Sequence, residues 1–320
     1  MTEQLFGTNL AAMVTPMNPD GTLSEPGLTS LVTHLLGTGC DGIVVAGTTG
    51  ESPTLTDAET THLVQTVATQ AAGRARVIAG IGTYDTAATV RRARDAETAG
   101  ADALLLVTPY YSRPTQPGII AHCFAVADST ALPVMLYDVP ARTGVAMAAT
   151  TLTELANHPN IRAVKDAKGD LFEAMTVMAE SPLAYYCGID ELNLPYLTAG
   201  ATGLVSVIGN LVADHNAALI QAVRTSDLPT AQAIQRSLIS LTAALMGTSQ
   251  GASTTKAVLA ELGIIPHATA RLPLLEPPAP QLRQVAQALA SWPELAGRTT
   301  RPEPRRRRAR RTGSVHAPAS

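Results

Sequence analysis

Eight short runs of aliphatic residues recur along the chain, and helical patterns separate them. Each run has four to six residues and is rich in Val, Ile and Leu, which is typical of parallel strands buried on both faces. Successive runs begin mostly about 25 to 35 residues apart, the length of one strand and helix unit. The runs are residues 10–15, 42–46, 76–81, 103–108, 134–137, 161–165, 184–188 and 203–207. Eight units in a row predict a closed (β/α)8 TIM barrel.

The intervening segments carry the periodicity and the end signals of helices. Ser24 precedes an apolar helical stripe, and Gly37 and Gly39 end it. Thr56 and Glu59 have the spacing of a capping box that opens the next helix. The two apolar stripes are Leu28, Leu31, Val32, Leu35 and Leu36, then Leu63, Val64, Val67 and Ala71, before Gly73. Both stripes are expected to pack against the barrel.

Beyond the eighth run, residues 211–297 show only helical periodicity, which a proline-rich segment at 272–280 interrupts before a final helix at 281–289. We therefore predict a catalytic barrel over residues 1–225 and a C-terminal helical appendage over 226–297. Residues 298–320 are predicted to be a disordered basic tail, because they are rich in arginine and offer little apolar surface to bury.

The net charge of −3 is unevenly distributed. Residues 301–320 contain seven arginines and one glutamate, so this tail carries +6 and the first 300 residues carry −9. Such a tail can contact nucleic acid or anionic lipid. Since it contains no aromatic residue for base stacking, a role in nucleic-acid binding is not expected.

We expect neither a membrane span nor a signal peptide. Its apolar runs are far shorter than the roughly 20 residues that cross a bilayer, and its first residues lack a basic start followed by an apolar run. We therefore expect a cytoplasmic protein without a membrane partner. Cys40, Cys123 and Cys187 are far apart in apolar surroundings, which predicts buried reduced thiols instead of disulfides or a metal site.

Reactive groups in such a barrel come from the C-terminal strand ends and the loops after them. The second strand is followed by Gly-Thr-Thr-Gly-Glu-Ser at 47–52, and the fourth leads into Thr-Pro-Tyr-Tyr at 108–111. The fifth leads into Tyr-Asp-Val-Pro-Ala-Arg-Thr-Gly at 137–144, and the sixth into Lys-Asp-Ala-Lys-Gly at 165–169. These motifs contain hydroxyl, phenol, Arg and Lys groups but neither His nor Cys, so no metal is expected.

Lys165 is the most informative of these residues. The chain has only three lysines, Lys165, Lys168 and Lys256, and Lys165 ends a buried strand. Burial there favours the neutral amine, which can attack a carbonyl and form a Schiff base. The alternative is a lysine that only pairs with Asp166 or another carboxylate.

Schiff-base chemistry also needs a proton shuttle and groups that hold the substrates. The hydroxyls of Tyr137, Thr49 and Tyr111 can pass protons, the backbone of the Thr48-Thr49 turn can hold one carboxylate, and Arg142 can hold another. Each has a simpler alternative: Tyr137 as a core tyrosine, the two threonines as an ordinary turn, and Arg142 as a surface ion pair.

Together, these motifs resemble those of the pyruvate-dependent class I aldolases, and the resemblance covers about residues 5–295. It implies that Lys165 forms the imine with pyruvate, without a cofactor, and that Tyr137 shuttles protons. Thr49 and Tyr111 would complete a proton relay, Tyr111 in the site of a neighbouring subunit, which implies a homotetramer. The substrate contacts that it implies are Thr48 and Thr49 to the pyruvate carboxylate, Arg142 to the carboxylate of L-aspartate 4-semialdehyde, and the backbone of Gly188 and Val205 along the pocket.

The chain departs from the family pattern in several places. Gly188-Ile189-Asp190 replaces a frequent Gly-Asp-Asp, so an apolar group stands where a carboxylate is common, while Asp138 and Asp166 replace Asn and Glu. In relatives inhibited by lysine, the effector site uses His, Asn and Glu. The matching positions here are taken to be Asp57, Thr60, Tyr84 and Ala88, which predicts weak or no inhibition by lysine.

Two other functions remain open at this point. One is a related aldolase or dehydratase, such as a sialic-acid lyase or a keto-sugar aldolase, that acts on another 2-keto acid. Arg142 favours instead a short substrate with a carboxylate. The other is a non-catalytic barrel that binds a partner through its basic tail. Removal of residues 301–320 would separate this second function from an enzyme.

Overall fold

The computed structural model describes residues 3–247, 251–290 and 292. The predicted basic tail and residues 293–297 lie outside them. The strands form one closed, parallel barrel in the order β1 to β8. They are β1 (Asn9–Ala12), β2 (Gly42–Val45), β3 (Arg76–Gly80), β4 (Ala103–Val107), β5 (Val134–Asp138), β6 (Ile161–Asp166), β7 (Ala184–Cys187) and β8 (Gly203–Ser206). The predicted barrel is confirmed.

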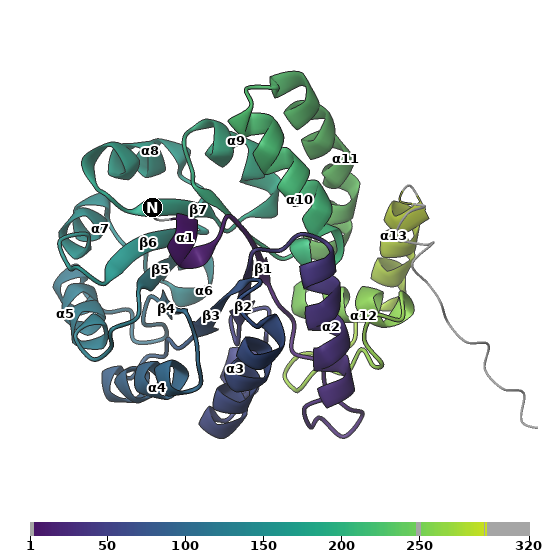
Figure 1. Cartoon of the computed structure of the whole chain (residues 1–320), viewed down its shortest axis with the longest axis horizontal. Helices are drawn as coiled ribbons and strands as arrows, with labels where there is room; N and C mark the ends of the chain where they lie inside the picture. Colours follow the sequence, from purple (N-terminus) through teal and green to yellow (C-terminus); the bar gives the residue numbers. More distant parts are fainter. Residues whose placement is uncertain (1–2, 248–250, 291, 293–320) are drawn as a thin grey trace, which may run out of the picture.

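The barrel is accompanied by helices, most of which surround it as an outer ring (Figure 1). They are α1 (Glu3–Phe6), α2 (Glu25–Gly37), α3 (Asp57–Ala71), α4 (Thr86–Thr98), α5 (Gln116–Ala127), α6 (Pro140–Thr143), α7 (Ala149–Leu155), α8 (Leu171–Glu180), α9 (Asn193–Thr198), α10 (Gly209–Arg224), α11 (Leu228–Met246), α12 (Gly251–Glu261) and α13 (Ala279–Ala290). Two 3-10 helices, η1 (Ser52–Thr54) and η2 (Asp190–Leu192), lie in the loops after β2 and β7.

Strand β1 ends three residues earlier than the apolar run predicts. Met13 still donates a backbone hydrogen bond to Val44, at 3.1 Å, but the chain then leaves the sheet. The hydroxyl of Thr15 donates to the carbonyl of Gly50, at 2.7 Å, and so supports the loop after β2. The end of the first apolar run therefore stabilises a functional loop instead of extending the barrel.

The signals that begin helices act as the sequence predicts. The Ser24 hydroxyl accepts a hydrogen bond from the N–H of Gly27, and Thr56 and Glu59 form the reciprocal capping box. Each such cap contributes about 1 kcal/mol, because it satisfies N–H groups that have no partner within the helix. The predicted inner faces of α2 and α3 are buried, apart from Leu36, which is half-buried.

Two hydrophobic layers hold the fold together. One lies between the strands and the outer helices. The other fills the barrel with side chains that include Leu10, Val44, Ile78, Leu105, Met135, Tyr137, Tyr186 and Val205. Because the interior is filled in this way, the barrel is not a pore, and only the ends of the strands are available for chemistry.

Helix α1 lies across the N-terminal end of the barrel and appears at the centre of the ring in Figure 1. Phe6 packs edge-on against Tyr186 with ring centres 6.1 Å apart, and the Tyr186 hydroxyl donates to the carbonyl of Gly7 at 2.8 Å. The carboxylate of Asp41 accepts hydrogen bonds from the N–H groups of Thr8 and Asn9, at 2.8 and 2.7 Å. These contacts fix the end of the barrel opposite the predicted site.

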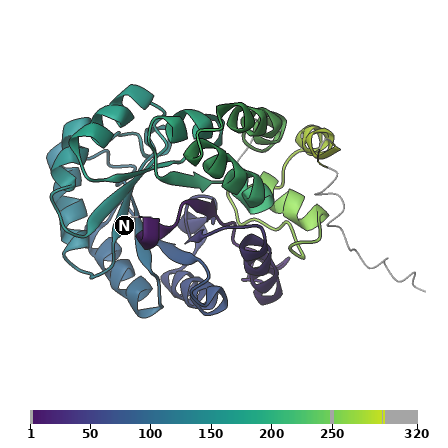
Figure 2. The ribbon, with the colours of Figure 1, turned by 45° about the horizontal axis from the view of Figure 1, so that its top comes forward.

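Helices α11, α12 and α13 follow the barrel and lie together on one side of it (Figures 1 and 2). The predicted C-terminal helical appendage is therefore confirmed, and the predicted last helix corresponds to α13. The predicted division at residue 225 falls between α10 and α11. It stays a prediction that these parts are separate domains.

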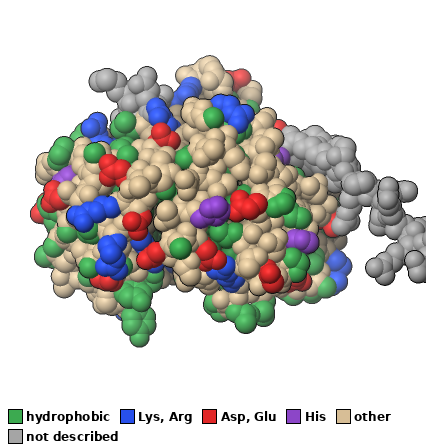
Figure 3. All heavy atoms as spheres, turned by 60° about the horizontal axis from the view of Figure 1, so that its bottom comes forward, with side chains coloured by type: hydrophobic (Ala, Val, Ile, Leu, Met, Phe, Trp, Pro, Cys, Tyr) green, Lys and Arg blue, Asp and Glu red, His purple; other side chains and the backbone are tan. Residues whose placement is uncertain are grey.

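The described surface carries both signs of charge. On the face in Figure 3, basic and acidic side chains are interspersed. No helix within the described residues is long and apolar enough to span a bilayer. Cys40, Cys123 and Cys187 are free and buried, as predicted, and burial raises the pKa of the Cys40 and Cys123 thiols to about 12.

Candidate active site

One cavity opens at the C-terminal ends of the strands, where the sequence predicts the site. Its wall brings together Thr48, Thr49, Tyr137, Arg142, Lys165 and Gly188, all of which the sequence singles out. The other lining residues are Val139, Ala167, Ile189, Asp190, Glu191, Val207, Met246, Gly251, Ala252 and Leu274.

Lys165 lies at the base of this cavity. It is in β6, pairs in register with Tyr137 of β5, and is only 5% exposed. Its Nζ lies 4.2 Å from the centre of the Tyr137 ring. The chain's other two lysines are bound to carboxylates, Lys168 to Glu173 and Lys256 to Glu51. Lys165 is the only lysine that lines this cavity.

Gly188 makes room for the Lys165 side chain. A Cβ atom at position 188 would lie 2.9 Å from Cε of Lys165 and 3.0 Å from the carbonyl oxygen of Asp166. Both distances are too short for carbon contacts in a packed site. Glycine is therefore required for β7 to end beside the extended lysine.

The loop after β2 is a tight turn that carries Thr48 and Thr49 onto the cavity wall. Gly50 N–H donates to the carbonyl of Gly47 at 3.0 Å, and Glu51 N–H donates to that of Thr48 at 3.1 Å. Glu51 has a φ of +61°, in the left-handed region that is unfavourable for side chains other than glycine. The loop thus holds a strained backbone that other contacts must stabilise.

Arg142 is on α6, the single helical turn that follows β5. Its N–H donates to the carbonyl of Val139 at 2.8 Å, and the Thr143 hydroxyl donates to the carbonyl of Val145, also at 2.8 Å. Gly144, with a φ of +77°, ends the turn. The guanidinium is exposed at the cavity wall, where it can bind a carboxylate from solvent.

Tyr111 does not meet Lys165 within one chain. It is 91% exposed on the loop after β4, with a φ of +68°, and does not line the cavity. Val205 also differs from the expected contact. It is buried in the barrel interior, and Val207 is the residue at the end of β8 that lines the cavity. Neither arrangement decides the predicted roles of Tyr111 and Val205.

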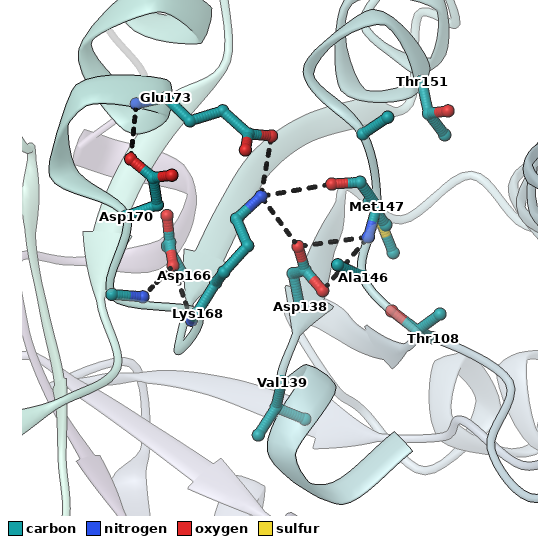
Figure 4. A network of polar contacts seen from close by, with 12 residues as sticks. Thr108, Asp138, Val139, Ala146, Met147, Thr151, Asp166, Lys168, Asp170 and Glu173 are labelled. Atoms are coloured by element: carbon teal, nitrogen blue, oxygen red, sulfur yellow. Dashed lines mark hydrogen bonds and ion pairs between the residues drawn. The ribbon is translucent and has the colours of Figure 1, made fainter. Parts of the chain in front are cut away.

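Two buried acids directly follow Tyr137 and Lys165, and Lys168 lies between them (Figure 4). Lys168 Nζ is 2.8 Å from Glu173, 3.4 Å from Asp138 and 3.1 Å from the carbonyl of Met147. Burial raises the pKa of Asp138 to about 6, although Lys168 opposes this shift. Burial also raises the pKa of Asp166, which accepts the Lys168 N–H at 2.8 Å.

Asp190 is committed to supporting the loop after β8. It is 4% exposed and accepts hydrogen bonds from the Ser206 hydroxyl and from the N–H groups of Val207 and Ile208, at 2.9 and 3.1 Å. Its neighbour Glu191 is exposed at the cavity wall. The cavity wall therefore still has a carboxylate available, that of Glu191, although Ile189 is apolar.

Sequence reasoning missed Glu191 and the contribution of the C-terminal region. The only available signal for Glu191 was its place three residues after Gly188, beyond the strand end. Met246, Gly251, Ala252 and Leu274 also line the cavity, although they belong to the predicted appendage. No spacing rule places these four residues over the barrel, because their positions depend on tertiary packing.

The fold and the site define a class I aldolase-type lyase, in which a buried lysine lies beside a tyrosine at the mouth of a TIM barrel. The chain matches the Dihydrodipicolinate synthetase family over residues 5–291 and belongs to it. Among the described residues, no cluster of three or more His, Cys, Asp or Glu side chains could hold a metal ion.

Relatives and solved structures agree with this assignment. A 4-hydroxy-tetrahydrodipicolinate synthase of Mycolicibacterium paratuberculosis is 50% identical over 259 residues, 81% of this chain and 86% of that protein. The dihydrodipicolinate synthase structure from Cyanidioschyzon merolae with lysine bound has a TM-score of 0.87 at 37% identity, covering 90% of this chain and 98% of that one. The Bacillus anthracis dihydrodipicolinate synthase DapA-2 has a TM-score of 0.86 at 36% identity, with 89% and 98% coverage.

Asp138→Asn is expected to change how stability depends on pH. The folded-state pKa of about 6 lies above the ordinary 3.8, so the folded chain binds more protons in this window. The contribution of Asp138 to stability is therefore present at low pH and is lost as the pH rises through 6. The loss should be on the order of 3 kcal/mol.

Asparagine cannot titrate. The free energy of unfolding of the original chain minus that of the variant should therefore decrease as the pH rises from about 4 to about 6. Urea unfolding of both proteins at half-unit pH steps measures this difference. A difference that stays constant across the window would show that Asp138 does not titrate there.

Proposed function

We propose that this chain condenses pyruvate with L-aspartate 4-semialdehyde to form 4-hydroxy-tetrahydrodipicolinate, in lysine and diaminopimelate biosynthesis. The observation that carries the proposal is the position of Lys165 at the base of a cavity, 4.2 Å from the centre of the Tyr137 ring. The Thr48-Thr49 loop and Arg142 lie on the wall of the same cavity. Relatives up to 50% identical have the name of this synthase, which supports the proposal.

The proposed reaction begins when the neutral amine of Lys165 attacks C2 of pyruvate, and one water leaves as the imine forms. Loss of a proton from C3 gives an enamine, whose C3 attacks the aldehyde carbon of the second substrate. The amino group of that substrate then attacks C2, closes the ring and displaces Lys165. In this proposal the Tyr137 hydroxyl moves the protons, which the 4.2 Å distance between its ring centre and Lys165 Nζ supports. No metal or organic cofactor takes part.

The second substrate has both an α-carboxylate and an α-ammonium, and the cavity offers a partner for each. Arg142 supplies the cation, and Glu191 supplies the carboxylate. The Glu191 side chain makes no hydrogen bond or ion pair to another residue in the described part of the chain. It is therefore free to bind an ammonium, whereas Asp190 is occupied by its own hydrogen bonds.

We further propose that the enzyme is a homotetramer in which Tyr111 completes the proton relay of a neighbouring site, together with Thr49. An aromatic side chain that is 91% exposed at a φ of +68° is costly in solvent, which supports contact with another subunit. One structural relative is described as a monomeric dihydrodipicolinate synthase variant. The cytoplasmic location and the weak inhibition by lysine stay predictions.

A related aldolase or dehydratase is the second candidate, because Ile189 places an apolar group on the cavity wall. Such an enzyme would form the same imine at Lys165 but would accept a different aldehyde. The two candidates therefore differ in turnover with aspartate semialdehyde and not in the trapping of pyruvate.

Lys165→Ala is expected to abolish turnover of pyruvate with L-aspartate 4-semialdehyde, by about 10³-fold or more, because the covalent intermediate cannot form. A coupled assay with the next reductase measures product formation directly. Borohydride with pyruvate should also add mass to Lys165 in the original chain.

Arg162→Ala is the matched control, since Arg162 is on the same strand but exposed. It should retain both activity and trapping. An unmodified Lys165 in a fully active enzyme would contradict the imine mechanism. Trapped pyruvate without turnover would instead favour the second candidate.

Glu191→Gln is expected to raise KM for aspartate semialdehyde about tenfold, because a charged hydrogen bond contributes about 1.5 kcal/mol. KM for pyruvate should not change. Succinic semialdehyde lacks the ammonium and cannot close the ring, so it serves as a competitive inhibitor against aspartate semialdehyde. Its inhibition constant should change much less than KM for aspartate semialdehyde, and equal changes in the two would show that Glu191 does not bind the ammonium.

Tyr111→Phe should reduce kcat strongly, because one hydroxyl of the relay is lost. Mixing this variant with Lys165→Ala under exchange conditions should restore part of the activity, since a mixed pair contains one complete site. Sedimentation of the same samples reports the assembly. Failure of the mixed tetramer to recover activity would place Tyr111 outside the neighbouring site.

A further inference from the structure

A buried ion pair joins the substrate-binding loop to the C-terminal region. Lys256 of α12 and Glu51 of the loop after β2 are in direct contact, and both side chains are fully buried. They are 205 positions apart in the sequence. Neither residue lines the active-site cavity, and the proposed reaction does not use them.

Both partners make a further hydrogen bond beside their mutual contact. Lys256 Nζ also donates to the carbonyl of Thr269 at 2.8 Å. One oxygen of the Glu51 carboxylate accepts from Lys256, and the other accepts from the N–H of Arg271 at 2.9 Å. A buried pair offsets the cost of leaving water only when its remaining hydrogen-bonding groups are satisfied in this way.

Arg271 extends the contact to two more segments of the barrel. Its Nε donates to the carbonyl of Gly21 at 2.9 Å, and its Nη1 donates to that of Thr54 at 2.7 Å. It also pairs with Glu59, in the first turn of α3. Hydrogen bonding to Arg271 lowers the pKa of Glu59 to about 2, so this pair is ionised at neutral pH.

These contacts stabilise two parts of the cavity wall, the loop after β2 and the C-terminal region. Glu51 directly follows the Thr48-Thr49-Gly50 turn, and its strained φ of +61° places its side chain in the pair. On the other side, Ala252 lies one helical turn before Lys256, and Leu274 lies three residues after Arg271. Both Ala252 and Leu274 line the cavity.

We infer that Glu51, Lys256 and Arg271 are positioning residues that lock the loop binding the pyruvate carboxylate against the C-terminal wall of the active site. The inference deepens the proposed function, since it assigns this network to the first substrate. When the pair is intact, the Thr48-Thr49 turn is held in its strained form before pyruvate arrives. Without the pair, part of the binding energy of pyruvate is needed to order the loop.

The test uses the double variant Glu51→Gln/Lys256→Met in the full chain. Removing Lys256 alone would leave a buried carboxylate without its cation, whereas the double variant removes both charges and keeps an acceptor for the Arg271 N–H. KM for pyruvate should rise about tenfold or more, while kcat and KM for the aldehyde change little. A network that only stabilises the fold would not separate the two KM values.

The matched control is Arg76→Met/Asp102→Asn, which removes a 3.0 Å ion pair at the N-terminal ends of β3 and β4. It should leave both KM values unchanged. A double variant that folds and has the original KM for pyruvate would overturn the inference. If the double variant does not fold, Arg271→Gln decides: a raised KM for pyruvate supports the inference, and an unchanged one overturns it.

A second readout separates this inference from the proposed function. The pyruvate concentration that gives half-maximal borohydride trapping at Lys165 needs no second substrate. It should rise in the double variant by the same factor as KM. If the original chain traps pyruvate but does not turn over aspartate semialdehyde, the proposed second substrate is wrong, and this shift still tests the inference.

Discussion

The closure of eight parallel strands forces every strand to end at the same face, and the site depends on this constraint. The interior of the barrel is filled, so a side chain at the last interior position of a strand has packed residues below it and the cavity above it. Lys165 occupies such a position, 5% exposed beside Tyr137. The barrel thereby supplies a sheltered amine that a carbonyl substrate can still reach.

Much of this arrangement could be predicted from the sequence because it follows strand periodicity. The aliphatic runs locate the strands within a few residues, and the groups after each run are then placed at one end of the barrel. Thr48, Thr49, Tyr137, Arg142 and Lys165 meet in one cavity for this reason. Gly188 was expected only from the family resemblance, and the structure supplies its physical reason, since a Cβ atom there would crowd Lys165.

The remaining parts of the site could not be predicted in the same way. Leu274 and Ala252 reach the cavity through the packing of helices after the barrel, and helical periodicity says which face is buried but not against what. The exposure of Tyr111 and the pairing of Glu51 with Lys256 are likewise tertiary. Sequence reasoning noted Glu51 only as part of a motif, and no local rule joins it to a residue 205 positions away.

The placement of the three lysines also determines where pyruvate can react. Lys168 and Lys256 are each held by a carboxylate and a backbone carbonyl, and neither lines the cavity, so neither amine is available to pyruvate. Lys165 instead faces the ring of Tyr137 and the open cavity. Selectivity for one amine therefore comes from the environments of all three lysines, and the carboxylate that binds Lys256 also belongs to the loop that carries Thr48 and Thr49.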